Sequence, residues 1–542
     1  MALMVRTYFL TLLAAVSLAF AATPVTAQAQ PLLLNIHDVS DDGYTYVGNP
    51  TNFGYVLLND NGASNTHKNG QLRITQNGVL LYETMGMSNA HDYDALNPVF
   101  FAFPRAGPYE VSSGVPASAA LNINNTFTGV VHEATNMVKA RIDPDEIPGS
   151  AAVNEATKFV FSVATEAGTL LEHSDALFEV RRSSDNWLVF RTHLHSHTEA
   201  MGLNYAFPEA GDYTVRIVGY QAFPGKNELS FEPVTYTKEV TATLEPPINV
   251  PDSSSREAEP RGTEDAESPY LLVLTTDPPG SAGGPPTVGA FGNVRLNALV
   301  FDTTAKALVP HVNFEASIVS GTGVERFSSI ALHEYDGHLE VVDQESTPGT
   351  YTYEVTAMKG EWKETKMVQF TVVPTAGANA PPGAGVTIVT ATGLDNIKAG
   401  VPQKIEFLAA TLAGTPHGHS EIEIQVLRGD QTGAPMLINK LHTHGDGKFG
   451  ATITFPDAGD YTLIMDVNTV HADATPRYYF EEVGKAPVVG LKVAEGVDLP
   501  NVPFSGMVSD AETPEVKGES PLPLIIGVLA VGVAVFARRR QA

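Results

Sequence analysis

The sequence contains no cysteine among its 542 residues. This absence excludes a disulfide framework, a thiolate metal site and a cysteine nucleophile. Basic residues are also few, because 33 lysines and arginines stand against 61 aspartates and glutamates. An acidic balance of this kind argues against nucleic acid as a partner, favours solubility and attracts cations.

Sequence signatures of catalysis are missing as well. The chain has neither the Gly-x-Ser-x-Gly nucleophile elbow of many hydrolases nor the His-Glu-x-x-His motif of zinc proteases. The stretch from Gly280 to Gly289 is rich in glycine and proline but has no lysine, so it does not match a phosphate-binding loop. We therefore expect that the protein is not an enzyme.

One short phrase occurs four times along the chain. Its clearest copies are Phe-Pro-Glu-Ala-Gly-Asp-Tyr-Thr-Val at 207–215 and Phe-Pro-Asp-Ala-Gly-Asp-Tyr-Thr-Leu at 455–463, with a shorter copy at 103–109 and a degraded one at 347–352. In each copy an alternating strand enters a turn with proline or glycine, and an aromatic residue opens the next strand. The repeat predicts four modules of antiparallel strands, and no segment between the two termini has a convincing helical period.

The phrase resembles the Asp-x-Gly-x-Tyr-x-Cys signature of immunoglobulin domains, with an aliphatic residue in place of the cysteine. The resemblance implies that each tyrosine ties its turn to nearby backbone, as in a tyrosine corner. We expect an all-β fold of four tandem immunoglobulin-like β-sandwiches, which fits a chain of this length. The expected modules 1 to 4 span residues 32–117, 151–244, 270–373 and 386–483.

Segments rich in proline, glycine or acidic residues separate these modules. Residues 245–268 predict a disordered acidic linker, 374–383 a shorter linker, and 486–520 an acidic spacer after module 4. Residues 118–149 either add strands to module 1 or form a joint.

Both ends of the chain carry apolar runs. Residues 1–29 predict a secretory signal peptide, and the uncharged residues 521–537, followed by arginines in 538–542, predict a transmembrane anchor with a short cytoplasmic tail. The tail resembles the C-terminal sorting signals of prokaryotic surface proteins, including the PGF and PEP types. We therefore expect a protein that is secreted across the cytoplasmic membrane and anchored at the cell surface.

Histidines recur at matching positions of the repeat. The segment His173-Ser174-Asp175 aligns without a gap with His419-Ser420-Glu421, and a short insertion then superposes a His-x-His pair of module 2 on one of module 4. Module 1 has a Met-x-Met pair at that position. The aligned residues of modules 1, 2 and 4 are His67, Met85 and Met87; His173, His193 and His195; and His419, His442 and His444.

These positions have the spacing of metal ligands. Residues i and i+2 of a strand face the same side, so His193 and His195 present two imidazoles in one direction, as do His442 and His444. A third nitrogen would come from the preceding loop. Candidates for this and for additional ligands are His173, His197 and Met201 in module 2, His417 and His419 in module 4, and His91 in module 1.

The ligand types favour copper, with zinc as the alternative. Three or four imidazoles suit Cu(II), Zn(II) or Ni(II), whereas two thioethers such as Met85 and Met87 suit Cu(I). Module 3 has His311, His333 and His338 but no His-x-His pair, so it is expected to be a spacer.

The repeated phrase with its upstream histidines also resembles YtkA-like extracytoplasmic β-sandwich modules and, more distantly, the CopC-like copper carriers. This resemblance implies copper handling outside the cytoplasm. Two hypotheses follow. In the first, modules 2 and 4 bind a transition metal. In the second, the histidines are solvated loop residues of a structural or adhesive stalk that binds a protein or cell-envelope partner.

Overall fold

A computed structural model describes residues 32–500 of the chain with internal gaps. The segments left out of this range are 37–44, 58–67, 86–87, 91–96, 115–124, 135, 198–199, 222–228, 245–268, 278–284, 286, 290–292, 303–306, 310, 330–331, 335–336, 346, 374–385, 412–415, 417–419, 443–446, 471–481 and 484–487. The predicted signal peptide, both linkers, the transmembrane anchor and the cytoplasmic tail lie outside the described residues.

Every helix or strand in the described residues is a β-strand, which confirms the predicted all-β class. The described part of the chain contains no helix long and apolar enough to cross a membrane. Alternation explains the strands. In β24 (Val312–Ser320), for example, every second residue from Val312 to Ile318 is buried, while Asn313, Glu315 and Ser317 are more exposed.

Modules 1 and 2 contain the first nineteen strands. Those of module 1 are β1 (Leu32–Ile36), β2 (Thr45–Tyr46), β3 (Pro50–Leu57), β4 (Lys68–Gln76), β5 (Val79–Met85), β6 (Ser88–Ala90), β7 (Asn97–Ala102), β8 (Gly107–Gly114) and β9 (Asn125–His132). Those of module 2 are β10 (Met137–Val138), β11 (Ala140–Glu146), β12 (Ser150–Ala152), β13 (Thr157–Thr165), β14 (Ser174–Arg182), β15 (Trp187–Ser196), β16 (Met201–Tyr205), β17 (Gly211–Tyr220), β18 (Ser230–Phe231) and β19 (Val234–Thr243).

Modules 3 and 4 contain the others. Those of module 3 are β20 (Tyr270–Asp277), β21 (Thr287–Gly289), β22 (Asn293–Asp302), β23 (Ala307–Leu308), β24 (Val312–Ser320), β25 (Glu325–Ser329), β26 (Leu332–Glu334), β27 (His338–Gln344), β28 (Gly349–Lys359) and β29 (Trp362–Val373). Those of module 4 are β30 (Val386–Thr392), β31 (Pro402–Thr411), β32 (Ser420–Arg428), β33 (Pro435–His442), β34 (Lys448–Thr454), β35 (Gly459–Val470), β36 (Glu482–Val483) and β37 (Val488–Val493).

The strand pairs define where two modules begin and end. Within residues 118–149, β9 pairs with β8 and belongs to module 1, whereas β11 pairs with β13 and belongs to module 2. The segment predicted to be an acidic spacer, 486–520, differs from expectation at its start. Its β37 pairs with β35, because Leu491 and Val493 are buried against module 4.

Each module has a central strand that pairs on one side with the next strand of the chain and on the other side with the strand that begins in the repeated phrase. β14 pairs with β15 and β17, β32 with β33 and β35, β4 with β5 and β8, and β24 with β25 and β28. On the opposite sheets, the pairs β3–β7, β13–β16, β22–β27 and β31–β34 correspond in the same way. β4, β14, β24 and β32 are therefore equivalent strands, so positions can be compared between modules.

The tyrosine of the repeated phrase is tied to backbone in three modules, as predicted. The hydroxyls of Tyr213, Tyr351 and Tyr461 donate to carbonyl oxygens four residues upstream, at 3.0, 2.8 and 3.1 Å. Two glycines of the phrase, Gly107 and Gly459, have φ angles of 127° and 144°, which residues with a side chain rarely adopt. The phrase therefore fixes the same turn in distant parts of the chain.

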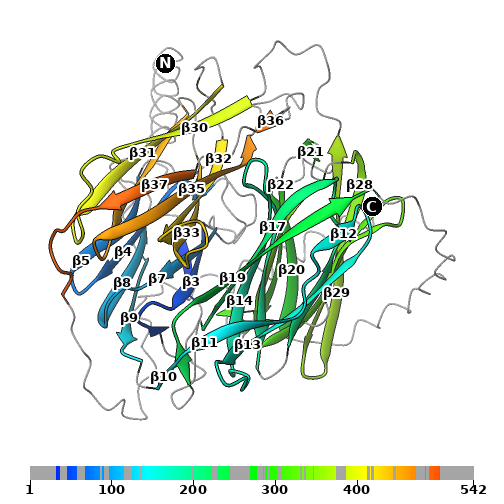
Figure 1. Ribbon diagram of the computed structural model, residues 1–542, viewed down its shortest axis with the longest axis horizontal. Coiled ribbons are helices and arrows are strands. Elements are labelled where there is room, and N and C mark those ends of the chain that lie inside the picture. Colours follow the sequence, from blue (N-terminus) through cyan, green and yellow to red (C-terminus); the bar gives the residue numbers. More distant parts are fainter. Residues whose placement is uncertain are drawn as a thin grey trace, which may run out of the picture.

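The modules associate in two pairs and not in chain order (Figure 1). β15 of module 2 pairs with β27 of module 3, while β16 of module 2 pairs with β25 of module 3. Because β15 is equivalent to β25, and β16 to β27, the contact is reciprocal, like that of a two-fold dimer. Modules 4 and 1 use the same strands, β33 with β7 and β34 with β5. Each pair thus covers edges that a single sandwich would expose.

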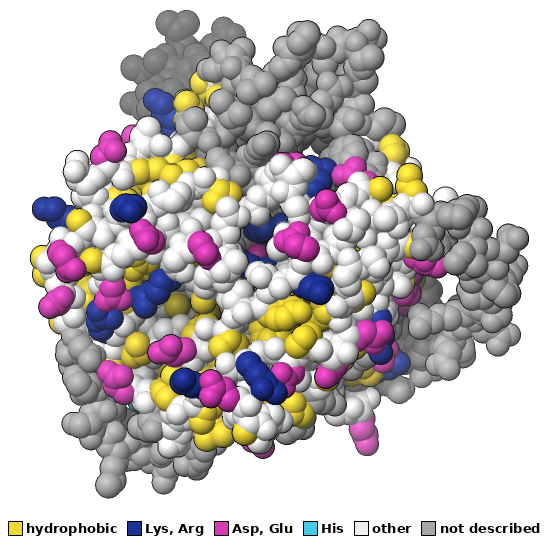
Figure 2. Space-filling view, in the orientation of Figure 1, with side chains coloured by type: hydrophobic (Ala, Val, Ile, Leu, Met, Phe, Trp, Pro, Cys, Tyr) yellow, Lys and Arg dark blue, Asp and Glu magenta, His cyan; other side chains and the backbone are white. Residues whose placement is uncertain are grey.

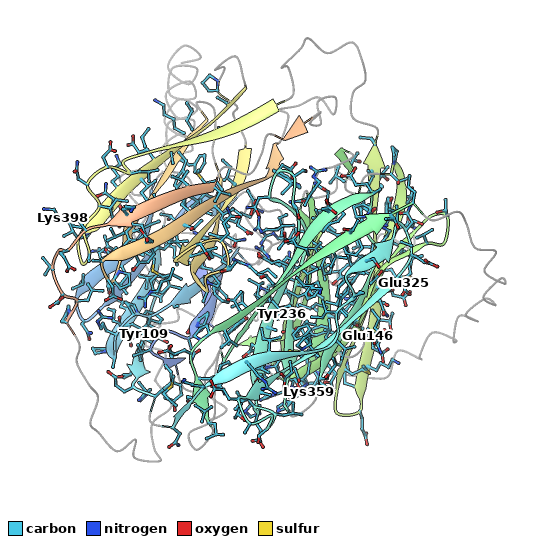
Figure 3. All side chains as sticks on the ribbon, viewed as in Figure 1. Tyr109, Glu146, Tyr236, Glu325, Lys359 and Lys398 are labelled. Atoms are coloured by element: carbon cyan, nitrogen blue, oxygen red, sulfur yellow. The ribbon has the colours of Figure 1, made fainter. Side chains whose placement is uncertain are left out.

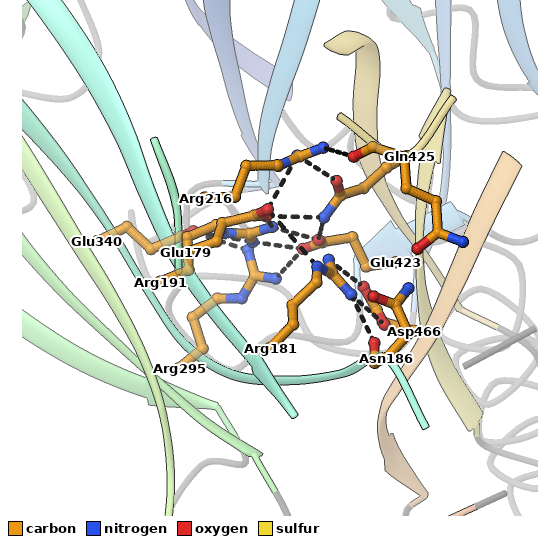
Figure 4. A network of polar contacts seen from close by, with 11 residues as sticks. Glu179, Arg181, Asn186, Arg191, Arg216, Arg295, Glu340, Glu423, Gln425 and Asp466 are labelled. Atoms are coloured by element: carbon orange, nitrogen blue, oxygen red, sulfur yellow. Dashed lines mark hydrogen bonds and ion pairs between the residues drawn. The ribbon is translucent and has the colours of Figure 1, made fainter. Parts of the chain in front are cut away.

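A buried set of charges joins the two pairs, and we call it the central charge network (Figure 4). It consists of four arginines and four carboxylates from modules 2, 3 and 4, namely Arg181, Arg191, Arg216, Arg295, Glu179, Glu340, Glu423 and Asp466. Arg181 donates to both carboxylate oxygens of Asp466, at 3.1 and 2.9 Å, and Arg295 bridges Glu340 and Glu423, at 2.6 and 2.7 Å. Buried charges need partners, and here the two signs balance.

The outer surface differs from this interior. On the face shown in Figure 2, acidic and basic side chains are interspersed and do not gather into a patch of one sign. The buried ion pairs between modules, such as Arg181–Asp466 and Arg295–Glu423, lie in the interior and not on this face.

Candidate metal centre

Two histidines occupy equivalent turns in modules 2 and 3. His173 immediately precedes β14 and His311 immediately precedes β24, strands of 9 residues each that end opposite the equivalent Tyr213 and Tyr351. Both histidines have positive φ angles, of 49° and 54°. A positive φ is uncommon for a residue other than glycine, so the shared value indicates the same local turn.

A second pair of histidines follows from the strand register. His195 lies opposite Asp175 in the β14–β15 ladder, and His333 lies opposite Asn313 where β26 pairs with β24. His195 Nδ1 is 2.8 Å from Asp175 Oδ1, and His333 Nδ1 is 2.6 Å from Asn313 Oδ1. Modules 2 and 3 therefore each supply a turn histidine and a strand histidine with a polar partner.

The reciprocal pairing of the two modules brings these residues together with His197, which follows β15. We call His173, His195, His197, His311 and His333 the histidine cluster. The ring of His197 lies 4.5 Å from those of His173 and His333, 5.1 Å from that of His195 and 5.5 Å from that of His311, measured between centroids. One atom from each of His195, His197 and His333 lies within 4.8 Å of the others.

The hydrogen bonds set which nitrogens face the cluster. Because Asn313 Oδ1 can only accept, His333 Nδ1 carries the proton and its Nε2 carries the lone pair. That Nε2 lies 3.1 Å from His311 Nδ1. In the same way Asp175 accepts from His195 Nδ1 and leaves Nε2 of His195 as the candidate ligand atom.

The environment keeps His333 neutral. Burial, together with the neighbouring His195, His197 and His311, lowers the pKa of His333 to about 3. Lys359, which Figure 3 labels at the end of β28, donates to the backbone oxygen of His311 at 3.4 Å. Metal ligands must be unprotonated, so a neutral His333 meets this requirement at neutral pH.

His193 does not belong to the cluster, although it faces the same side of β15 as His195. Its Nδ1 lies 3.1 Å from the hydroxyl of Tyr220, and its ring is 6.2 Å from that of Phe100 in module 1. It lines a cavity of about 40 Å³ beside Lys440, where all four modules meet. Two residues along a strand are separated by roughly 7 Å, which places His193 in the interface between the module pairs.

The alignment of the His-x-His pairs of modules 2 and 4 predicted from the sequence is wrong by two residues. Glu421 pairs with His442 as Asp175 pairs with His195, so His442 corresponds to His195 and Lys440 to His193. The side chains of Met85 and His442, which end β5 and β33, are not described. The other predicted ligands of modules 1 and 4 lie outside the described residues, and they are His67, His91, Met87, His417, His419 and His444.

Module 3, expected to be a spacer, contributes two members of the cluster, His311 and His333. The missed signal is the match of His311-Val312-Asn313 to His173-Ser174-Asp175, which the equivalent tyrosines bring into register. His338 takes no part, since its Nε2 is 3.0 Å from Asn297 Oδ1. Met201, an additional candidate ligand, is buried in the hydrophobic core.

Comparisons with known proteins give no family. No family model matches the chain, and no curated protein matches its sequence. Among solved structures, Escherichia coli alpha-2-macroglobulin activated by porcine elastase is similar at 10% identity and a TM-score of 0.17, over 86% of this chain and 44% of that one. The chain thus spans less than half of the macroglobulin.

Two adhesion proteins give similar values. A tetra-tandem repeat in the extending region of a large adhesion protein has 10% identity and a TM-score of 0.15, over 86% of this chain and 100% of that one. The Escherichia coli adhesin FdeC has 13% identity and a TM-score of 0.14, over 66% and 96%. Similarities at this level do not assign a function.

Proposed function

We propose that this protein binds a transition metal ion, Cu(II) or Zn(II), at the histidine cluster between modules 2 and 3. The observation that carries the proposal is the triad His195, His197 and His333, whose candidate ligand atoms lie within 4.8 Å of one another. Two nitrogens bound to one zinc ion lie at most about 4.2 Å apart, because each bond is about 2.0–2.1 Å long. Small side-chain rotations would bring the triad onto one ion.

The donor set favours copper over zinc. All members of the cluster are imidazoles, which suit both ions, and a nitrogen site of this kind binds Cu(II) more tightly than Zn(II). His173 and His311 would supply a fourth ligand from either side of His197. The centre differs from the predicted one because it draws on modules 2 and 3, and His193 is not among its ligands.

The wider role we propose is that of a secreted, membrane-anchored surface protein of four immunoglobulin-like modules, which stores, scavenges or delivers the metal. The apolar runs at residues 1–29 and 521–537 support export and anchoring. The excess of acidic residues would attract cations. The resemblance of the repeated phrase to YtkA-like modules supports copper handling outside the cytoplasm.

The test is metal content. Purified protein is loaded with Cu(II) or Zn(II) and dialysed, and its metal content is measured by inductively coupled plasma mass spectrometry. A His195→Ala/His333→Ala variant is treated in the same way. We expect the wild type to retain the metal and the variant to lose it, since the variant removes two of the three triad ligands.

His193→Ala is the matched control, because His193 lies on the same strand outside the cluster. It should retain as much metal as the wild type. A wild type that retains no metal, or a His195→Ala/His333→Ala variant that retains as much as the wild type, would contradict the proposed function.

A further inference from the structure

Asp175 and Asn313 are equivalent residues on the two sides of the candidate metal centre. Each is the second residue of its central strand, two positions after the turn histidine of its module. Each lies opposite the strand histidine in the ladder, Asp175 opposite His195 and Asn313 opposite His333. The reciprocal contact between modules 2 and 3 therefore relates one half of the cluster to the other.

Both residues make the same hydrogen bond. The side-chain oxygen of each accepts from Nδ1 of its histidine, at 2.8 Å for Asp175 and 2.6 Å for Asn313. This bond fixes the tautomer and the ring orientation, so that Nε2 carries the lone pair that would bind an ion. Asp175 is buried, with 8% of its surface exposed, so its bond to the imidazole is little weakened by water.

The two halves differ in charge and in burial, since Asp175 is buried and Asn313 is exposed. Asp175 is a carboxylate and Asn313 an amide, so only the module 2 half places a formal negative charge behind a ligand. A carboxylate bonded to Nδ1 makes the opposite nitrogen more basic and stabilises positive charge on the metal–imidazole unit. An amide orients the ring without supplying this charge.

We propose that Asp175 is the positioning residue that sets the metal affinity of the cluster, while Asn313 orients His333 without adding charge. The inference rests on the proposed function and goes beyond it, because it assigns unequal roles to two equivalent positions. It also predicts that the carboxylate can be moved to the other half of the centre and still act.

The experiment compares three variants with the wild type by competition with a chromogenic chelator, for Cu(II) and separately for Zn(II). Asp175→Asn keeps the hydrogen-bond acceptor and removes the charge, so it should weaken binding about 10- to 100-fold. Asn313→Asp should tighten it. The exchanged variant, Asp175→Asn/Asn313→Asp, should regain most of the affinity lost in Asp175→Asn.

The exchange separates positioning from a general effect on the fold. A residue needed only for folding would not be rescued by a carboxylate in another module, and thermal unfolding without metal should be similar for Asp175→Asn and the exchanged variant. Unchanged affinity in Asp175→Asn, or an exchanged variant as weak as Asp175→Asn, would overturn the inference while the proposed function stands. A wild type without metal affinity would overturn both the proposed function and this inference. The measurement on the wild type alone reveals that outcome.

Discussion

The imidazole rings of His195 and His333 lie 5.5 Å apart, although one belongs to module 2 and the other to module 3. They meet because β15 and β24 to β27 belong to two modules that share continuous sheets. An ion bound by both rings would connect the two modules directly. Metal binding and the association of modules 2 and 3 should therefore depend on each other.

The first prediction concerns stability with metal. A ligand that binds only the folded state adds about 2.7 kcal/mol to the free energy of unfolding when its free concentration is 100 times Kd. Thermal unfolding of the wild type should shift upward with Cu(II) or Zn(II), and His333→Ala should lose that shift. His193→Ala should keep it, and an equal shift in all three proteins would place the metal elsewhere.

The second prediction concerns the central charge network. Glu423 is buried and contacts Arg191 and Arg295, so Glu423→Gln leaves two buried guanidinium groups short of a charge partner. Removing one partner of a buried ion pair costs about 3–5 kcal/mol. Urea unfolding should show this loss in the free energy of unfolding.

Glu406→Gln provides the control for that measurement. Glu406 pairs with Lys404 at 2.6 Å on the surface, where an ion pair contributes little. If Glu423→Gln were no more destabilising than Glu406→Gln, the network would not hold the module pairs together.

The third prediction follows from two carboxylates of the network. Burial alone would raise the pKa values of Glu179 and Glu340. The attraction of the surrounding arginines outweighs burial and lowers both pKa values from the usual 4.5 to about 2. A lowered folded-state pKa gives stability that is present above pH 4.5 and is lost as the pH falls towards 2. Small-angle scattering from pH 7 to 2 should show a compact particle that expands only below about pH 4. Expansion already at pH 6 would contradict this assignment.

The fourth prediction concerns a carboxyl group whose pKa is raised, so its contribution to stability changes with pH in the opposite direction. Glu345 and Asp343 are buried together beside Arg326, and burial and the nearby Asp343 raise the pKa of Glu345 well above its usual value. The stability from neutral Glu345 is full below pH 4.5 and is lost as the pH rises through the folded-state pKa. Glu345→Gln stays neutral, so its free energy of unfolding relative to wild type should increase with pH. The exposed Glu354→Gln is the control, and a pH-independent difference for Glu345→Gln would refute the prediction.

The repeat made the local structure predictable, because turn chemistry and alternation are local properties. The repeated phrase around Tyr213 and Tyr461 predicted two equivalent turns. The position of His173 in the loop before a strand predicted that this residue lies near the end of β15. The pairing of modules 2 with 3 and 4 with 1 was not predicted. It depends on which sheet edges meet in space, and no short sequence pattern carries that information.

The candidate centre was only partly predictable for the same reason. The sequence drew attention to His195 and His197, but it grouped them with His193, whose place in the module interface depends on Tyr220 and Phe100. His311 and His333 were missed because module 3 has no His-x-His pair. Their match to module 2 becomes visible only when Tyr351 fixes the register of β24.

The most direct test of the central claim is a crystal structure of metal-loaded protein with anomalous diffraction recorded at the absorption edge of the metal. We expect one strong anomalous peak between modules 2 and 3, with His195, His197 and His333 as ligands and His193 still beside Tyr220. A peak at another site, or no peak in protein soaked with Cu(II) or Zn(II), would contradict the account.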